Sequence, residues 1–453
     1  MARAKKEAAL TPEERLQAAL VPDWEWPYKL PKNWCWTTVG AINQYVGISA
    51  DPTKAKNKTF ELYSVPSSAD NYPEIVLGAD IGSTKQSVKK GDVLLCKINP
   101  RINRVWKVSK YTDHSLLASS EWIVIRNSGL ISNYLMWCFR SPYFRGYMLS
   151  NVSGVGGSLM RAQPKFVQGY PVPVPPLAEQ QRIVDRIESL FAKLDEAKEK
   201  AQTVVDSFEN RKASILHKAF TGELTAKWRE EHGVGMESWE KKSVGELCIS
   251  LKYGTAKKSD ASGNVVVLRM GNLQQGEIDW SDLAYSNDPD DIEKYKLFPG
   301  DVLFNRTNSA ALVGKTAIYR GEHPAIYAGY LIKLDYDRDK IIGDYLNYAL
   351  NTLDAKKYCN SVKTDGVNQS NINAKKIGAY SFNVPSIPEQ EKIVSVIQKL
   401  LSKEQQTKEA AEAVLDQSDL MKKSILARAF RGELGTNDPS EESAVELLKR
   451  TIL

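Results

Sequence analysis

A repeated stretch decides the architecture of this chain. Residues 174–224 read VPPLAEQQRIVDRIESLFAKLDEAKEKAQTVVDSFENRKASILHKAFTGEL, and the stretch recurs at a constant offset of 210 residues. VPSIPEQ at 384–390 matches VPPLAEQ at 174–180, and AFRGEL at 429–434 matches AFTGEL at 219–224. An ungapped match over about 50 positions is not chance, so the chain is built as an internal repeat.

Outside these stretches the two halves are less alike. Trp34 corresponds to Trp239, and Gly-Asp-Val-Leu at 91–94 corresponds to the same four residues at 300–303, with small changes of offset. Each half is therefore a divergent domain of roughly 150 residues, the usual size of one domain, followed by a well-kept segment.

The well-kept segments have the pattern of long helices. Core-type residues recur in steps of four and three, which is the seam of a coiled coil; they are Ile183, Ile187, Leu190, Leu194, Ala197, Ala201, Val204 and Phe208. In the second copy Glu404 and Ser418 interrupt the seam. We expect 177–220 and 387–430 to be single helices packed antiparallel within one chain; pairing between two copies of the chain is the alternative.

The ends of these helices have their own signals. Ser386 and Glu389 fit the capping box of a helix start. Gly222 and Gly432 are typical left-handed helix stops. The runs that begin at Thr11 and at Asp438 resemble capped starts of short terminal helices.

The divergent segments combine strand-like and helix-like runs. Strands are predicted at 123–125 and 265–268, and helices at 133–139 and 344–350. The fold class expected is α+β: two similar mixed α/β domains separated by two long antiparallel coiled-coil helices. The predicted limits are a leader helix at 1–24, domains at 25–174 and 236–384, helical spacers at 175–235 and 385–435, and a C-terminal helix at 436–453.

Composition narrows the functional classes. The net charge is +6, but residues 25–171 hold 18 Lys and Arg against 9 Asp and Glu, whereas residues 236–384 hold 19 of each. The first domain therefore has the electrostatics that a polyanion partner needs. The absence of long apolar runs predicts a soluble, intracellular protein, and five scattered Cys with four His predict neither disulfides nor a metal site.

Catalytic motifs are not apparent. Gly314-Lys315-Thr316 resembles the end of a phosphate-binding loop, but the motif needs glycine at 309, where the chain has Ser309. No Ser/His/Asp or Cys/His arrangement stands out. The motifs alone therefore point to no catalytic site.

Residues suited to nucleic-acid contact follow matching strands in both halves. Arg and Lys suit guanine and phosphate, and Asn and Gln suit adenine. The candidates after the Gly-Asp-Val-Leu strands are Lys97, Asn99, Arg101, Asn103, Arg104 and Lys107, and Asn305, Arg306, Asn308 and Lys315. A second polar loop precedes each helical segment, with Ser158, Arg161, Gln163 and Lys165, and with Asn368, Gln369, Asn371, Asn373, Lys375 and Lys376. Any one of these residues alone fits a solvated loop equally well; their recurrence in both halves favours a shared function.

With these motifs together, the chain resembles the specificity subunits of type I restriction-modification enzymes over nearly its whole length. The motifs are those at 174–180, 384–390, 219–224 and 429–434, and Thr-Ala-Lys-Trp-Arg at 225–229. The resemblance implies two target-recognition domains, each reading one half of a bipartite asymmetric DNA site. It also implies that the helices set the spacing between the half-sites and dock two modification (methyltransferase) subunits.

The resemblance assigns the chemistry to other subunits. Restriction subunits would join to form the endonuclease, and S-adenosylmethionine, ATP and Mg would bind to partner subunits, so that this cytoplasmic chain carries no cofactor. Two other classes stay open: a coiled-coil protein-interaction scaffold without DNA specificity, which the balanced charge of the second domain supports, and a nucleic-acid enzyme with an unrecognised site.

Overall fold

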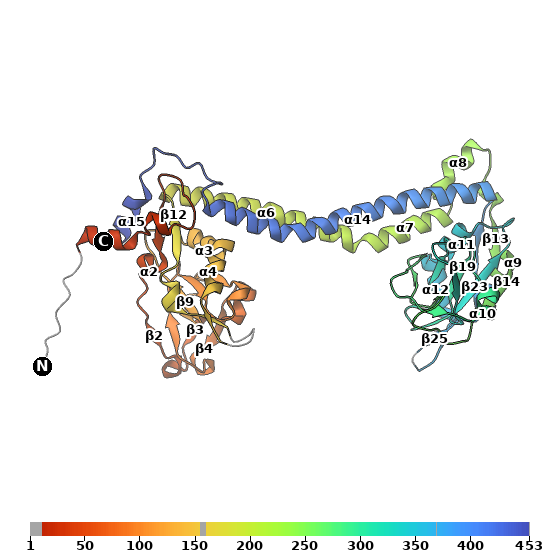
Figure 1. Cartoon of the computed structure of the whole chain (residues 1–453), viewed down its shortest axis with the longest axis horizontal. Helices are drawn as coiled ribbons and strands as arrows, with labels where there is room; N and C mark the ends of the chain where they lie inside the picture. Colours follow the sequence, from red (N-terminus) through yellow and green to blue (C-terminus); the bar gives the residue numbers. More distant parts are fainter. Residues whose placement is uncertain (1–10, 155–159, 368, 453) are drawn as a thin grey trace. The chain divides into compact units, whose positions relative to one another are not determined.

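The computed structural model describes residues 11–154, 160–367 and 369–452. The chain forms two compact units, of which unit 1 combines 1–200 with 413–453 and unit 2 comprises 201–412 (Figure 1). The repeated helices α6 (Leu177–Asp206) and α14 (Ile387–Phe430) contribute residues to both units. Each unit holds one divergent domain, in agreement with the predicted α+β class.

Unit 1 contains a mixed sheet and a smaller antiparallel sheet. The five-stranded sheet has the order β2 (Ser49–Ala50), β5 (Lys85–Ser87), β8 (Ser115–Ala118), β3 (Thr59–Tyr63) and β4 (Glu74–Leu77), and only the β3–β8 pair is parallel. The three-stranded sheet is β7 (Val105–Lys107), β6 (Val93–Cys96) and β9 (Trp122–Ile125). Two further pairs are β1 (Cys35–Thr38) with β12 (Pro171–Val174) and β10 (Val152–Ser153) with β11 (Arg161–Ala162). Every residue of β6 and β9 is buried, which explains their uniformly apolar sequences.

The core of unit 1 joins both ends of the chain. Its helices are α1 (Pro12–Ala19), α2 (Val39–Ile42), α3 (Ser132–Arg140), α4 (Pro142–Ser150), α5 (Pro164–Val167), the first part of α6, the last part of α14, and α15 (Ala444–Ile452). One apolar cluster includes Trp36, Tyr134, Ile183, Phe430 and Leu448. The helix expected to start near Asp438 begins at Ala444, because the 438–441 segment forms turns that Asp438 stabilises by accepting from the Ser440 amide.

Unit 2 repeats this plan with different strands. Its main sheet is antiparallel, in the order β14 (Cys248–Tyr253), β23 (Leu331–Tyr336), β19 (Val302–Asn305) and β21 (Thr316–Ile318). A second sheet is β18 (Tyr285–Ser286), β15 (Val265–Leu268) and β22 (Ala325–Tyr327), and a third is β20 (Thr307–Asn308), β25 (Ser370–Asn371) and β24 (Thr364–Asp365). Pairs β13 (Glu240–Ser243) with β26 (Ser381–Val384) and β16 (Leu273–Gln274) with β17 (Glu277–Ile278) complete it.

The helices of unit 2 enclose its main core. They are α7 (Phe208–Phe220), α8 (Ala226–Glu231), α9 (Val244–Leu247), α10 (Pro289–Lys294), α11 (Gly343–Leu350), α12 (Leu353–Val362) and α13 (Ala374–Gly378), together with the first part of α14. Tyr345 on α11, Leu216 on α7 and Ile393 on α14 belong to one apolar cluster. The long helices thus belong to the core of the domain.

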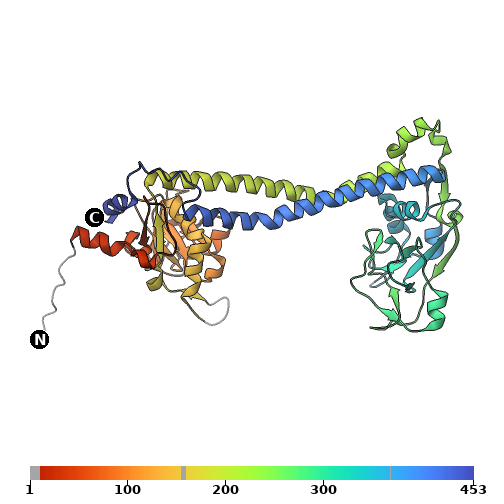
Figure 2. The ribbon, with the colours of Figure 1, turned by 45° about the horizontal axis from the view of Figure 1, so that its top comes forward.

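The repeated helices pack antiparallel within the chain, as predicted. In unit 1 the Lys422 ammonium lies 2.5 Å from the Asp195 carboxylate, and Lys198 lies 3.6 Å from Asp419. In both views α6 and the C-terminal part of α14 run side by side (Figures 1 and 2). In unit 2 the Arg211 guanidinium lies 2.6 Å from Glu404, so one polar seam residue is accommodated by an interhelical ion pair.

The prediction of one unbroken helix over 177–220 is wrong. The segment is divided at Ser207 into α6 and α7, whereas α14 is continuous. The Ser207 hydroxyl donates to the Thr203 carbonyl at 2.5 Å, and the Arg211 guanidinium donates to the Val204 carbonyl at 3.1 Å. These side chains compete with backbone amides for the same carbonyls, which is a known way to disturb a helix.

The capping box predicted for Ser386 and Glu389 is also wrong. Glu389 is fully buried, and its carboxylate accepts from the Arg229 guanidinium at 2.7 Å, from the Thr225 hydroxyl at 2.7 Å and from the Trp239 indole at 3.0 Å. A charge-assisted hydrogen bond is stronger than one to a neutral amide. The carboxylate therefore joins the start of α14 to the segment that follows α7 and does not cap its own helix.

The predicted helix stops are confirmed. Gly222 follows α7 with φ of 81°, and Gly432 follows α14 with φ of 77°. This left-handed conformation favours glycine. A Cβ at Gly222 would lie 2.7 Å from the Met236 sulfur, so close packing adds to the backbone requirement.

Candidate nucleic-acid interface

In unit 1 the structure joins the two polar loops that the sequence presents separately. After β6 ends at Cys96, the Lys97 carbonyl accepts from the Ala162 amide at 2.8 Å, and the Asn99 amide donates to the Met160 carbonyl at 2.8 Å. Ile98 and Arg161 form an isolated antiparallel bridge between these contacts. The two loops therefore form one continuous surface, here called the unit 1 loop pair (97–104 and 160–165).

The tip of this loop pair has a constrained backbone. Asn99 and Asn103 have φ of 47° and 55° and flank a single 3-10 turn at Pro100–Ile102. Asparagine tolerates this conformation better than most residues. The Asn103 side-chain amide donates to the Arg140 carbonyl at 3.1 Å, and this hydrogen bond anchors the turn to the end of α3. Arg101, between the two asparagines, is exposed at the tip.

Unit 2 forms the same arrangement. Thr307 pairs with Asn371 and Asn308 pairs with Ser370 where β20 meets β25. The Ile372 amide donates to the Arg306 carbonyl at 2.8 Å, which extends the pairing. The unit 2 loop pair (305–308 and 369–372) is thus built from the strand-end loop and the loop before the helix, like its counterpart in unit 1.

Arg306 is held in place by an aromatic ring. Its guanidinium carbon lies 4.8 Å from the centre of the Tyr253 ring, and its Nη1 donates to the Gly329 carbonyl at 3.3 Å. The Tyr253 hydroxyl accepts from the Ala374 amide at 2.9 Å, so the ring is itself fixed. Tyr253 was missed in the sequence because it lies on β14, far from the polar loops; an aromatic residue at a strand end is too common a signal to identify it.

The candidate side chains differ in how they are engaged. Arg161 pairs with Glu121 at 3.3 Å, Lys165 lies 4.8 Å from the ring centre of Phe166, and Asn308 accepts from the Ser309 amide. Within the described ranges no intramolecular hydrogen bond or ion pair engages the side chains of Lys97, Arg101, Gln163, Gln369 and Lys375.

The candidate Arg104 lies near the buried Cys96 thiol. Burial raises the pKa of this thiol, and the Arg104 charge opposes the rise.

The side chains of Lys107 and Lys315 lie elsewhere, the predicted contact Asn305 is fully buried, and two predicted residues lie outside the described ones. The Lys107 ammonium donates to the Asn133 side chain at 2.6 Å, at the opposite end of β7 from the loop pair. The Lys315 ammonium donates to the Gln274 side chain at 2.9 Å and lines a cavity against α7. Ser158 and Asn368 are outside the described residues.

Conserved positions of the repeat tie each domain to its helix. The Gln180 side chain accepts from the Ile131 amide at 2.9 Å and donates to the Pro175 carbonyl at 3.0 Å. Gln390 makes the same contacts with Ile342 and Pro385, at 3.0 and 2.9 Å. These side chains fix the starts of α3 and α11 against the starts of the long helices.

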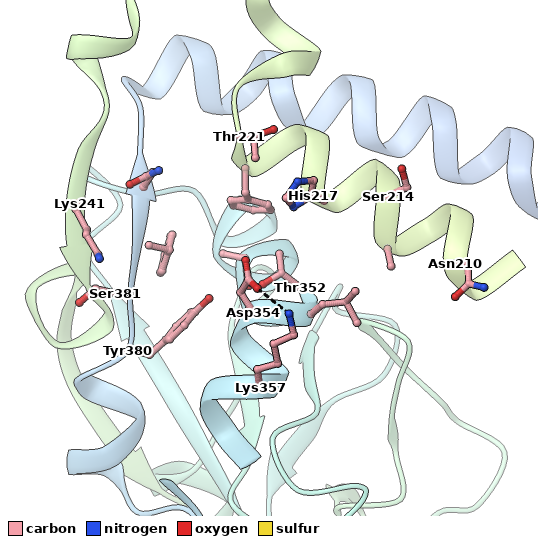
Figure 3. A pocket seen from close by; sticks show the side chains of 16 residues that line it. Asn210, Ser214, His217, Thr221, Lys241, Thr352, Asp354, Lys357, Tyr380 and Ser381 are labelled. Carbon is pink, nitrogen blue, oxygen red and sulfur yellow. Dashed lines mark hydrogen bonds and ion pairs between the residues drawn. The ribbon is translucent and has the colours of Figure 1, made fainter. Parts of the chain in front are cut away.

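Unit 2 also contains a cavity of about 610 Å³, whose lining residues can be checked for a catalytic arrangement (Figure 3). Asn210, Ser214 and His217 line it from α7, and Thr221 lines it from just beyond that helix. The α12 residues Asp354 and Lys357, whose charged groups lie 3.7 Å apart, complete this wall. Among its described lining residues His217 forms no side-chain hydrogen bond to a hydroxyl or carboxylate. The arrangement therefore offers no nucleophile–base pair of the kind that hydrolases and transferases use.

The described residues contain neither a membrane-spanning helix nor a cluster of metal ligands. No helix in the described ranges is both long and apolar enough to cross a membrane. No group of three or more His, Cys, Asp or Glu side chains, among the residues the structure covers, is placed to hold a metal ion.

Comparisons with known proteins agree with this architecture. Residues 236–415 match the family model described as the type I restriction modification DNA specificity domain. The chain is 27% identical over 306 residues to the type I restriction enzyme StySPI specificity subunit of Salmonella potsdam, covering 67% of this chain and 65% of that protein. It is 27% identical over 321 residues to the EcoKI specificity subunit of Escherichia coli K12, covering 69% and 68%. The chain thus spans just under two thirds of the first relative.

A solved structure supports the fold. The crystal structure of the HsdS subunit from Thermoanaerobacter tengcongensis has a TM-score of 0.68 and 22% identity, and the match covers 90% of this chain and 100% of that one. At this identity the likeness concerns the fold. The family model over residues 236–415 and the sequence relatives show that the chain is similar to type I restriction enzyme specificity subunits.

Proposed function

We propose that the chain is the DNA-recognition subunit of a type I restriction-modification complex. The observation that carries the proposal is that each unit joins two polar loops into one loop pair, at equivalent places in the two domains. A single polar loop is ordinary, but two loops that converge in both halves form two matched surfaces. The match of residues 236–415 to a type I restriction modification DNA specificity domain favours DNA as the partner for such surfaces.

In this proposal each domain reads one half of a bipartite asymmetric site. Base-edge contacts come from residues such as Arg306 and Gln369, and phosphate contacts from Lys97 and Arg101. Arg306 is suited to reading a base, because its fork of donors is held by Tyr253 and Gly329 and so loses little freedom on binding. The net charge of +9 over residues 25–171 favours association with a polyanion.

In this proposal the long helices have a structural role that is separate from DNA reading. The antiparallel pair of α6 and α7 with α14 sets the spacing between half-sites and docks two modification subunits, and restriction subunits complete the endonuclease. S-adenosylmethionine, ATP, Mg and both catalytic centres, including that of the adenine methyltransferase, belong to these partners. The chain itself is non-catalytic and acts in the cytoplasm.

Domain replacement tests the proposal. Residues 25–174 are exchanged for the corresponding domain of a relative, and the chain is expressed with its modification subunits. Methylation-sensitive sequencing of the host DNA should show one half of the target changed, with the other half and the spacing retained. If both halves change, or the spacing changes, the domains do not read DNA independently and the two-reader proposal is wrong.

The scaffold alternative has a separate test. A protein-interaction scaffold would leave the assembled complex with DNA binding that is indifferent to the loop pairs. Retention of duplex DNA that decreases steeply with salt, and that depends on Arg101 and Arg306, supports recognition by this chain. Retention that is unchanged when both are replaced favours the scaffold.

A further inference from the structure

A cavity of unit 2 gathers three lysines between α7 and α12. It has a volume of about 310 Å³, at the lower end of the range for small-ligand sites. Lys212 lies on α7 and Lys356 lies on α12, while Lys315 directly precedes β21. In Figure 1 β25 of the loop pair lies at the far side of the domain from α7.

The three cations have no counter-charge at contact distance. The Lys212 ammonium donates to the Gln275 carbonyl at 3.4 Å, and Lys315 donates to the Gln274 side chain at 2.9 Å. Within the described residues neither forms an ion pair, and the Lys356 ammonium has no partner at all. Glu209 is the carboxylate that lines the cavity, and it lies beyond ion-pair distance of each lysine.

The cluster has an electrostatic cost. Burial lowers the pKa of Lys212, Glu209 opposes this, and the charge of Lys356 lowers it further. Burial and Lys356 also lower the pKa of Lys315. A bound anion removes this repulsion, because an opposite charge within a few ångströms favours the charged form of each lysine.

The internal repeat shows that this cluster is not a general feature of the fold. Lys212 corresponds to Lys422 at the offset of 210, and Lys422 pairs with Asp195 at 2.5 Å. At the same offset Asp195 corresponds to Gln405. Unit 2 therefore has a glutamine where unit 1 has the carboxylate, and Lys212 contacts Gln275 of the recognition domain instead.

We propose that this cavity binds a phosphate group. Ammonium groups supply the charge, and the side-chain amide of Asn210 on its wall supplies further donors for a tetrahedral oxyanion. The group is either a backbone phosphate of DNA or part of a free phosphate-bearing molecule. Phosphate binding by the chain does not depend on the reading role of the loop pairs.

Inorganic phosphate is the first probe. Thermal unfolding of the full chain is followed while sodium phosphate replaces sodium chloride at constant ionic strength. Phosphate should raise the midpoint for the wild type and for Lys357→Gln, and this rise should disappear in Lys356→Gln. The pair is well matched, because both lysines are exposed on α12 and Lys357 is paired with Asp354 outside the lysine cavity.

Duplex DNA is the second probe, with the assembled complex. A backbone phosphate as occupant predicts that Lys356→Gln reduces the slope of log affinity against log salt by about one unit. An unchanged slope, together with the phosphate-dependent midpoint shift, assigns the cavity to a free phosphate-bearing molecule. The proposal is overturned if phosphate gives no shift in the wild type and the DNA slope is unchanged. Failure of the loop pairs to bind DNA appears separately, in Arg101→Ala and Arg306→Ala.

Discussion

At the scale of single residues, the buried carboxylates matter most. Glu389 and Glu179 occupy the same position of the repeat, and both are fully buried. Glu389 is paired with Arg229, whereas Glu179 is paired with Arg182 and also accepts from the Asn437 amide at 3.1 Å. From sequence alone, a carboxylate at a helix start is interpreted as a capping residue. Only the folded chain shows that each one binds a segment distant in sequence.

Removing one partner of such a pair should be costly. Glu389→Ala leaves the Arg229 charge buried without its counter-ion, for which about 3–5 kcal/mol of destabilisation is expected. Denaturant unfolding of the chain measures this loss. Glu391→Ala is the control, because Glu391 is exposed on the same helix turn and should change the stability by less than about 0.5 kcal/mol. Equal effects of the two substitutions would show that the ion pair contributes nothing.

Arg101 and Lys107 provide a matched pair for DNA binding. Both were predicted as contacts, but only Arg101 lies at the tip of the unit 1 loop pair, while Lys107 is bonded to Asn133. Arg101→Ala should weaken DNA binding by the assembled complex, either on all sequences with a salt slope lower by about one, or by roughly 1–3 kcal/mol at one position of the site. Lys107→Ala should leave binding unchanged. If Lys107→Ala weakened binding and Arg101→Ala did not, the DNA-reading surface would lie nearer α3 than the loop pair.

At the scale of elements, the helix ends illustrate two separate costs. Gly222 and Gly233 both have positive φ, of 81° and 64°. A Cβ at Gly222 meets the Met236 sulfur at 2.7 Å and the Arg229 guanidinium at 3.1 Å, whereas a Cβ at Gly233 meets nothing within 4 Å.

Alanine substitution separates these costs. Gly233→Ala should cost about 1–2 kcal/mol from the left-handed backbone alone. Gly222→Ala should cost more, because it also displaces the residues that hold Glu389. Urea unfolding monitored in unit 2 gives both values, and a smaller loss at Gly222 than at Gly233 would contradict the packing argument.

Elements differed in how well the sequence predicted them. The long helices and their glycine stops were predictable, because heptad spacing and a 210-residue repeat are long signals. The interruption at Ser207 was not, because it depends on where the Arg211 side chain lies. The loop pairs were predicted as residues but not as pairs, since the bridge from Ile98 to Arg161 joins positions that no local pattern connects.

At the scale of the whole molecule, the two units have separate cores. Phe430 is fully buried against Tyr134 in unit 1, with ring centres 5.3 Å apart. Its repeat counterpart Phe220 lies 4.9 Å from Tyr345 in unit 2. Each phenylalanine is the last residue of its helix and packs it against the core of one domain.

Truncating either residue should weaken one unit. Phe430→Ala should destabilise unit 1 by about 3–5 kcal/mol, and Phe220→Ala, which is less buried, should destabilise unit 2 by less. Hydrogen exchange read by mass spectrometry locates the loss. Faster exchange in both units from either substitution would mean that the chain unfolds as one cooperative body.

The composition of unit 1 from both ends of the chain has a consequence for biosynthesis. A ribosome delivers 201–412 as one uninterrupted length, whereas 11–200 emerges long before Leu426, Phe430 and Leu448 exist to complete its core. Domains usually fold as they are synthesised, N-terminal first. Here the order is reversed: the second domain finishes first, and the nascent first domain stays incomplete, exposed to chaperones and proteases, until residues 413–453 have been synthesised.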